Sequence, residues 1–132
     1  MTTSARGTFE VTLNKQPLQD TEAGANLGRM SIAKAFRGDL VAASTGEMLS
    51  AVTEVKGSAG YVAIERVSGT LHGRSGSFVL QHSGTVTRGE KSLMVSVVPD
   101  SATGELAGLA GKMAIDIVDG KHLYTLEYEL KP

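Results

Sequence analysis

Hydrophobic and polar residues alternate at every second position along most of the chain. In "TFEVTLN" the apolar residues Phe9, Val11 and Leu13 are each separated by one polar residue, which is the period of a β-strand with one face in solvent. The same pattern recurs at residues 27–37, 40–52, 59–71, 75–87, 92–98, 105–118 and 121–130. The sequence therefore predicts eight strands.

The segments between these strands carry turn residues. They are "QPLQDTEAGAN", "RGD", "VKGSAG", "HGRS", "TRGEK", "PDSATG" and "VDGK", which are rich in Gly, Pro, Asp and Asn. Eight short strands joined by hairpins predict an all-β fold, an eight-stranded antiparallel β-barrel, because closure removes unpaired edges. A β-sandwich is the alternative. The stretch "LGRMSIAKAFRG" also fits a short amphipathic helix, but its period of two and flanking glycines favour a strand.

The turn in "VDGK" fixes the register of the last hairpin. Asp119 and Gly120 form a two-residue turn of the Asp-Gly type, which pairs Val118 with Lys121 and places Ile115 opposite Tyr124. One face of this hairpin then collects Met113, Ile115, Ile117, His122, Tyr124, Leu126, Tyr128 and Leu130. This apolar face predicts the barrel interior.

A second hairpin predicts a carboxylate and an imidazole inside the barrel. Gly73 and Arg74 suit a type II′ turn, which pairs His72 with Ser75 and, further along, Glu65 with His82. One hypothesis makes Glu65 and His82 a catalytic acid/base pair, with Tyr61 as a third polar group. The alternative is a structural cross-strand pair that fixes the register.

The remaining polar residues offer fewer candidates. His72 lies beside a turn and is expected in solvent without a role, whereas His122 is expected on the inner face at the barrel mouth. The orientation of Glu47 stays open because the "FRGDL" turn admits two registers. The histidines have no HxH or HxxxH spacing, so no metal site and no cofactor are predicted.

Two glycine-rich stretches share one spacing. "GTLHGRSGSFVL" begins at Gly69 and "GELAGLAGKMAI" begins at Gly104. Neither contains G-x-G-x-x-G or a GK[ST] ending with a following helix, as a phosphate-binding loop requires. Both precede strands, so their glycines are expected to permit tight turns and close backbone contacts.

Composition narrows the class of protein. The 132 residues fit a single domain over 1–132. The 13 Lys and Arg nearly balance the 14 Asp and Glu, so no basic surface for nucleic acid is expected. The absence of cysteine excludes disulfides and thiolate sites. Without an export signal or a long apolar run, the chain is expected to be cytoplasmic with no membrane partner.

Three long segments carry a resemblance to a known family. They are "GEMLSA", "KGSAGYVAIERVSGTLHGRSGSFVLQHSGT" and "VVPDSATGELAGLAGKMAIDI". They resemble a bacterial family of small single-domain proteins of unknown function with an allene oxide cyclase-like barrel. The stretch from Thr103 to Gly111 is similar to a glycine-rich turn of allene oxide cyclases and dirigent proteins. The resemblance implies an eight-stranded antiparallel barrel and no transferable catalytic residues.

Three functions fit these features. The first is binding of a hydrophobic small molecule in the barrel interior; its ligand-binding residues would be Tyr61, Phe78, Leu80, His122 and Tyr124. The second is an isomerase or cyclase that uses Glu65 and His82. The third is a filled barrel that acts as a structural or interaction module. Apolar residues on the outward face of the strands, Val62, Ile64 and Val79, predict contact between subunits of a homo-oligomer.

Overall fold

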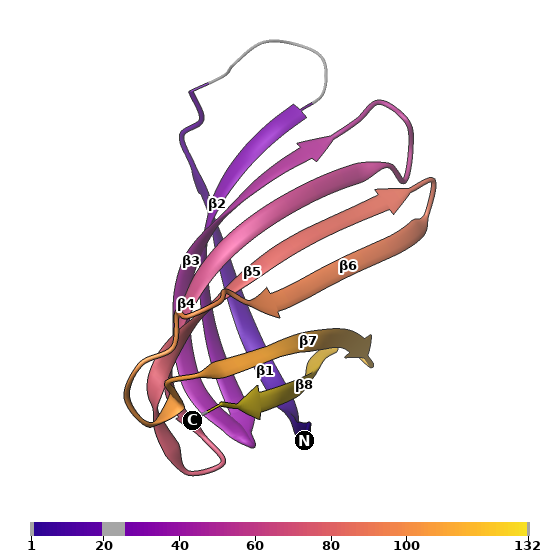
Figure 1. The fold of residues 1–132 in the computed structure, drawn as a ribbon. Helices are drawn as coiled ribbons and strands as arrows, with labels where there is room; N and C mark the ends of the chain where they lie inside the picture. The colour runs from indigo at the N-terminus through magenta and orange to yellow at the C-terminus, as the bar shows by residue number, and fades with distance from the viewer. Residues whose placement is uncertain (1, 20–25, 132) are drawn as a thin grey trace.

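The computed structural model describes residues 2–19 and 26–131. The strands in this part of the chain are β1 (Thr3–Gln16), β2 (Asn26–Gly38), β3 (Leu40–Val52), β4 (Ala59–Leu71), β5 (Arg74–Thr87), β6 (Glu90–Val97), β7 (Leu109–Val118) and β8 (Lys121–Leu130). Each strand pairs antiparallel with the next, and β8 returns to β1, so the sheet closes into a barrel (Figure 1). The predicted eight-stranded antiparallel barrel is confirmed, and the sandwich is not favoured.

The strands follow the alternation in the sequence. Along β2 the side chains of Ile32, Lys34 and Phe36 are buried, while Ala33 and Ala35 between them are exposed. The helical alternative for this stretch is therefore wrong. Most strand limits agree with the prediction to within two residues, and the largest differences are in the first and seventh strands. The first strand is longer than the segment "TFEVTLN", and residues 105–118 begin with the 3₁₀ turn η1 (Gly104–Leu106) before β7 starts.

Both chain termini lie at one end of the barrel (Figure 1). Buried side chains fill the interior of this end, which we call the packed end. Its fully buried side chains include Ala5, Leu40, Val67, Leu71, Phe78, Leu80, Leu106, Tyr124 and Leu126. The Tyr124 ring meets Phe36 edge to face, with the ring centroids 5.6 Å apart. The Tyr124 hydroxyl accepts from Leu40 N at 2.9 Å and donates to Arg37 O at 2.9 Å. The interior of this end is therefore filled by its own side chains.

The two glycine-rich stretches meet where the packed end closes. The backbone N–H of Thr103 donates to Ser77 O at 2.8 Å, so the loop before η1 runs along β5. A Cβ on Gly76 would lie 2.1 Å from the Thr103 carbonyl oxygen, and Gly104 has a φ of +63°. These glycines therefore permit a close backbone contact and a turn, as their position before strands predicted.

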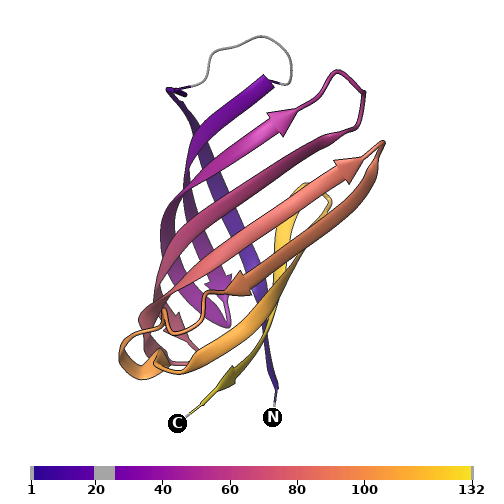
Figure 2. The ribbon, with the colours of Figure 1, turned by 45° about the horizontal axis from the view of Figure 1, so that its top comes forward.

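The other end of the barrel is open along one side. Strand β6 pairs with β7 only at Ser96 and Lys112 within the described residues, and the two strands diverge from there (Figure 1). Figure 2 shows the same barrel from a second direction. Two inward-facing side chains near this gap, Leu93 and Ile117, are 44% and 63% exposed. At this end the barrel is a curved, partly open sheet.

The two predicted hairpin registers had different outcomes. The register at Asp119 and Gly120 is confirmed, because Val118 pairs with Lys121 and Ile115 with Tyr124. The register at Gly73 and Arg74 is wrong. Leu71 pairs with Arg74, so the central turn residues are His72 and Gly73, with φ of 46° and 80°.

This turn has positive φ at both central residues, as in type I′, and histidine tolerates that region better than most residues. Glu65 consequently pairs with Leu80, and His82 pairs with Ala63. Because the partner moved by two positions, both side chains keep the inner face. The prediction that Glu65 lies directly across from His82 is corrected to a diagonal pair.

Among the described residues, no helix has the length and apolar character needed to cross a membrane.

Candidate functional site

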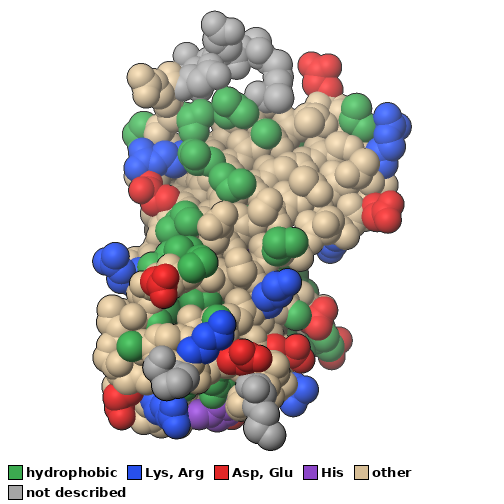
Figure 3. Space-filling model, viewed as in Figure 1, with side chains coloured by type: hydrophobic (Ala, Val, Ile, Leu, Met, Phe, Trp, Pro, Cys, Tyr) green, Lys and Arg blue, Asp and Glu red, His purple; other side chains and the backbone are tan. Residues whose placement is uncertain are grey.

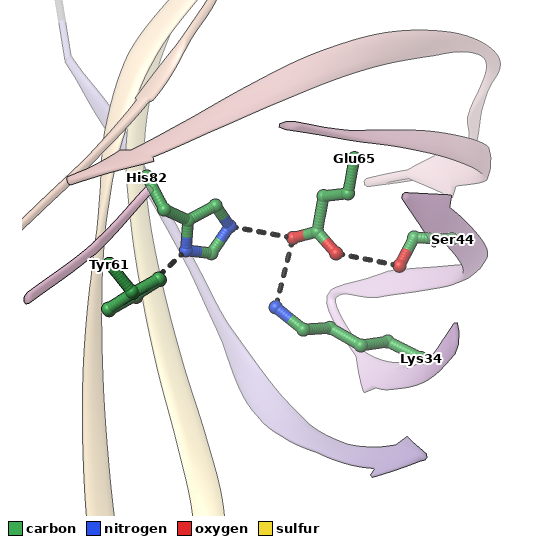
Figure 4. A network of polar contacts seen from close by, with 5 residues as sticks. All are labelled: Lys34, Ser44, Tyr61, Glu65 and His82. Atoms are coloured by element: carbon green, nitrogen blue, oxygen red, sulfur yellow. Dashed lines mark hydrogen bonds and ion pairs between the residues drawn. The ribbon is translucent and has the colours of Figure 1, made fainter. Parts of the chain in front are cut away.

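A buried polar network joins four neighbouring strands in the middle of the barrel (Figure 4). At its centre lies Glu65 of β4, which is 0% exposed. Its Oε1 accepts from Lys34 Nζ of β2 at 2.9 Å and from His82 Nε2 of β5 at 3.0 Å. Its Oε2 accepts from Ser44 Oγ of β3 at 2.9 Å. The carboxylate therefore has partners on both oxygens.

The partners keep Glu65 ionised despite its burial. Burial acts to raise the pKa of Glu65, but the hydrogen bond from His82 and the charge and hydrogen bond of Lys34 outweigh it and hold the pKa below its ordinary value. The Lys34 ammonium also lies 4.8 Å from the centroid of the Phe9 ring, a cation–π contact. Lys34 and Glu65 thus form a buried ion pair.

The network continues from His82 to Tyr61. The Tyr61 hydroxyl lies 3.3 Å from His82 Nδ1. We assign the imidazole proton to Nε2, because that nitrogen faces the carboxylate, and Nδ1 then accepts from the Tyr61 hydroxyl. Burial, followed by the nearby charge of Glu65, raises the pKa of Tyr61, so the phenol keeps its proton at neutral pH.

Tyr61 also lines a pocket of about 280 Å³ on the concave side of β3 to β6, at the open end of the barrel. We call this pocket the cup. Its lining residues are Met48, Ser50, Val52, Ala59, Gly60, Tyr61, Gly84, Thr85, Val86, Lys91, Ser92 and Leu93. Its volume is just below the range of roughly 300–1,000 Å³ typical of pockets for drug-sized ligands. The cup therefore suits a small molecule.

Most of the predicted ligand-binding residues lie away from the cup. Phe78, Leu80 and Tyr124 are at most 2% exposed and belong to the packed end. His122 is half-buried on the inner face, with its ring centroid 5.0 Å from that of Phe9, and lines a different depression. Of the five residues, Tyr61 lines the cup.

The outer face of the barrel carries other residues of interest. Glu47, whose orientation the sequence left open, faces outward and accepts a hydrogen bond from Arg29 Nε at 2.7 Å. Val62 and Ile64 are half-exposed and line an outer groove of about 520 Å³. Figure 3 shows that one face of the molecule carries a band of hydrophobic side chains. Contact between subunits through Val62, Ile64 and Val79 stays a prediction.

Sequence reasoning missed two members of the network, Lys34 and Ser44. The signal for Lys34 was present, because it shares the parity of Ile32 and Phe36 and must therefore point inward. Ser44 offers no such signal, since serine is common on either face of a strand. Its role follows only from its distance to Glu65.

His72 was expected in solvent without a role, but it has partners. Its Nδ1 lies 2.5 Å from the Tyr128 hydroxyl, and its Nε2 lies 3.6 Å from Asp39 Oδ2. Its side chain is 36% exposed. Within residues 2–19 and 26–131, no group of three or more His, Asp or Glu side chains is placed to hold a metal ion.

Comparison with known proteins agrees with this fold. A crystal structure from Shewanella oneidensis MR-1, described as a protein with unknown function from the DUF3224 family, has 53% sequence identity and a TM-score of 0.97. The match covers 100% of this chain and 99% of that one. Among curated proteins, no significant match is found. The family model described as "Protein of unknown function (DUF3224)" matches residues 5–128. The chain therefore belongs to the DUF3224 family.

Proposed function

We propose that the protein binds a small, mainly apolar molecule in the cup. The observation that carries the proposal is a concave, largely apolar pocket of about 280 Å³ whose wall includes Tyr61, the end of the buried polar network. Ligand pockets commonly combine an apolar lining with a few fixed polar groups. The packed end of the barrel leaves the open end as the place where a ligand would enter.

The apolar residues of the cup lie on the inner face of the sheet, where pairing of β6 with β7 along their whole length would bury them. Val52 and Leu93 face the concave side, yet they are 52% and 44% exposed. Each square ångström of apolar surface that a ligand covers contributes about 25 cal/mol. The polar residues Tyr61 and Lys91 lie in the same wall and would orient one polar group of the ligand.

Binding of the neutral fluorescent probe N-phenyl-1-naphthylamine tests this proposal. The probe brightens in an apolar site, so titration gives a dissociation constant. Leu93→Gln should weaken binding about tenfold, which corresponds to about 1.4 kcal/mol of lost apolar contact. Met94→Gln is the matched control. Met94 is the next residue of β6, is 62% exposed and faces outward, so its substitution should leave binding unchanged.

Two results would contradict binding in the cup. One is the absence of a saturable signal with the wild-type protein. The other is an equal loss of affinity in Leu93→Gln and Met94→Gln, which would place the probe on a surface other than the concave wall.

A further inference from the structure

We propose that the cup is also a site of proton transfer, in which Tyr61 exchanges a proton with a bound carbonyl compound and His82 takes the proton that Tyr61 releases. This inference rests on the proposed binding function and goes further by naming a reaction and a substrate class. Glu65, Lys34 and Ser44 would be positioning residues, because they touch the imidazole or one another and do not line the cup.

Tyr61 is the one member of the polar network that can contact a ligand in the cup. Glu65 is 0% and His82 3% exposed, and both nitrogens of His82 have partners. No buried side-chain nitrogen or oxygen in the described part of the chain lacks a hydrogen-bond partner. The Tyr61 hydroxyl donates a hydrogen bond to His82 Nδ1, and its oxygen keeps two lone pairs. Tyr61 is the member of the network that lines the cup, so a ligand there would meet the network at Tyr61.

The transfer is balanced without any oxidant or reductant. A C–H bond next to the ligand carbonyl breaks, and its proton moves to the Tyr61 oxygen while the Tyr61 proton moves to His82 Nδ1. The electron pair of the C–H bond forms the carbon–carbon double bond of an enolate, whose charge lies on the carbonyl oxygen. The imidazolium that results lies 3.0 Å from the Glu65 carboxylate, which stabilises it. The reverse steps return a proton to the same carbon or to another one.

The substrate class follows from the groups in the wall. Lys91 provides a cationic side chain in the lining of the cup, and it would attract the enolate oxygen that forms during the transfer. The rest of the wall is largely apolar. The ligand that fits both features is a small apolar ketone with an acidic C–H beside its carbonyl group.

Isomerisation of 3-cyclohexen-1-one to its conjugated isomer 2-cyclohexen-1-one provides the test. The reaction moves one proton between two carbons and is followed by ultraviolet absorbance. Tyr61→Phe, which removes a single oxygen, should lower kcat by at least about a hundredfold, as expected for loss of a general acid–base group, with KM nearly unchanged. The matched control Tyr128→Phe removes the hydroxyl that contacts His72 and should keep the wild-type kcat.

Binding of the ketone is measured separately, through displacement of N-phenyl-1-naphthylamine, and urea midpoints verify that both variants fold. If the ketone displaces the probe but wild-type protein and Tyr61→Phe isomerise it at equal rates, the proton transfer is wrong and the binding proposal still stands. Failure of the wild-type protein to bind the probe at all would overturn both. If the probe binds but the ketone does not displace it, the substrate class is wrong and this inference falls with it.

Discussion

Two trios of tyrosine, histidine and carboxylate occur in this barrel, with the same order of contacts and different surroundings. Tyr61, His82 and Glu65 lie inside the barrel, whereas Tyr128, His72 and Asp39 lie at its packed end. In both trios the tyrosine hydroxyl meets Nδ1 and the carboxylate meets Nε2. The distance from the histidine Nε2 to the carboxylate oxygen is 3.0 Å in the inner trio and 3.6 Å in the outer one.

The surroundings separate the two trios. The side chains of Glu65 and His82 are 0% and 4% exposed, whereas those of Asp39 and His72 are 45% and 36% exposed. The inner trio has a buried counter-ion, Lys34, and its tyrosine lines the largely apolar cup. Tyr128 and His72 of the outer trio line a more polar depression. The comparison teaches that burial of the polar groups and an apolar neighbouring pocket, more than residue identity, make a group of polar side chains a candidate site.

The outer trio connects two turns of the barrel through hydrogen bonds. Asp39 Oδ2 accepts from the backbone N–H of Arg6 at 2.8 Å, and the backbone N–H of His72 donates to the Asp39 carbonyl oxygen at 2.9 Å. Tyr128 adds a contact from β8. These bonds hold the β2–β3 and β4–β5 turns beside β1 and β8, where solvent screens the charges.

The largest expected difference between the trios is in stability. Glu65→Gln leaves the Lys34 ammonium buried without a counter-charge and should lower the free energy of unfolding by about 3–5 kcal/mol. Asp39→Asn changes an exposed carboxylate and should cost about 1 kcal/mol or less. Urea unfolding of both variants measures the difference, and equal losses would contradict the distinction drawn between the trios.

A double variant shows whether the stability loss in Glu65→Gln comes from the unpaired Lys34 charge or from poorer packing. Adding Lys34→Met to Glu65→Gln removes the buried ammonium that the single substitution leaves behind. The double variant should therefore be more stable than Glu65→Gln alone. A double variant that is less stable than the single one would assign the loss to packing instead.

A smaller effect is expected in the pH dependence of stability. The folded-state pKa of Glu65 lies below its ordinary value of 4.5, so its stabilising contribution is complete above that value and is lost as the pH falls through the lowered pKa. Urea unfolding between pH 3 and pH 6 should show a shallower loss of stability on acidification for Glu65→Gln than for the wild type. Parallel curves for the two proteins would contradict an ionised Glu65 at the barrel centre.

Much of this architecture follows from local sequence. Period-two alternation identified the strands, and the Asp119-Gly120 turn fixed its register because those residues favour one turn type. The register at His72 failed, since the sequence admits two turns and a histidine with positive φ is uncommon. Glu65 and His82 still share the interior, because a shift of two residues preserves the face.

The cup could not be predicted in the same way. It depends on where β6 and β7 stop pairing, which the local pattern of either strand does not reveal. Phe78 and Leu80 have the same alternation as Val86, yet Phe78 and Leu80 are buried in the packed end and Val86 lines the cup. The difference lies in which strands cover them, a long-range property of the barrel.

The protonation of His82 tests the central claim most directly. Nitrogen-15 NMR of histidine-labelled protein at neutral pH distinguishes a nitrogen that carries a proton from one that carries a lone pair. We predict one nitrogen of each kind for His82, with the proton on Nε2 beside Glu65 and the lone pair of Nδ1 facing the Tyr61 hydroxyl. Tyr61→Phe should shift the Nδ1 signal because it removes that hydrogen bond. Protons on both nitrogens of His82 would leave no acceptor for the Tyr61 proton and would contradict the account.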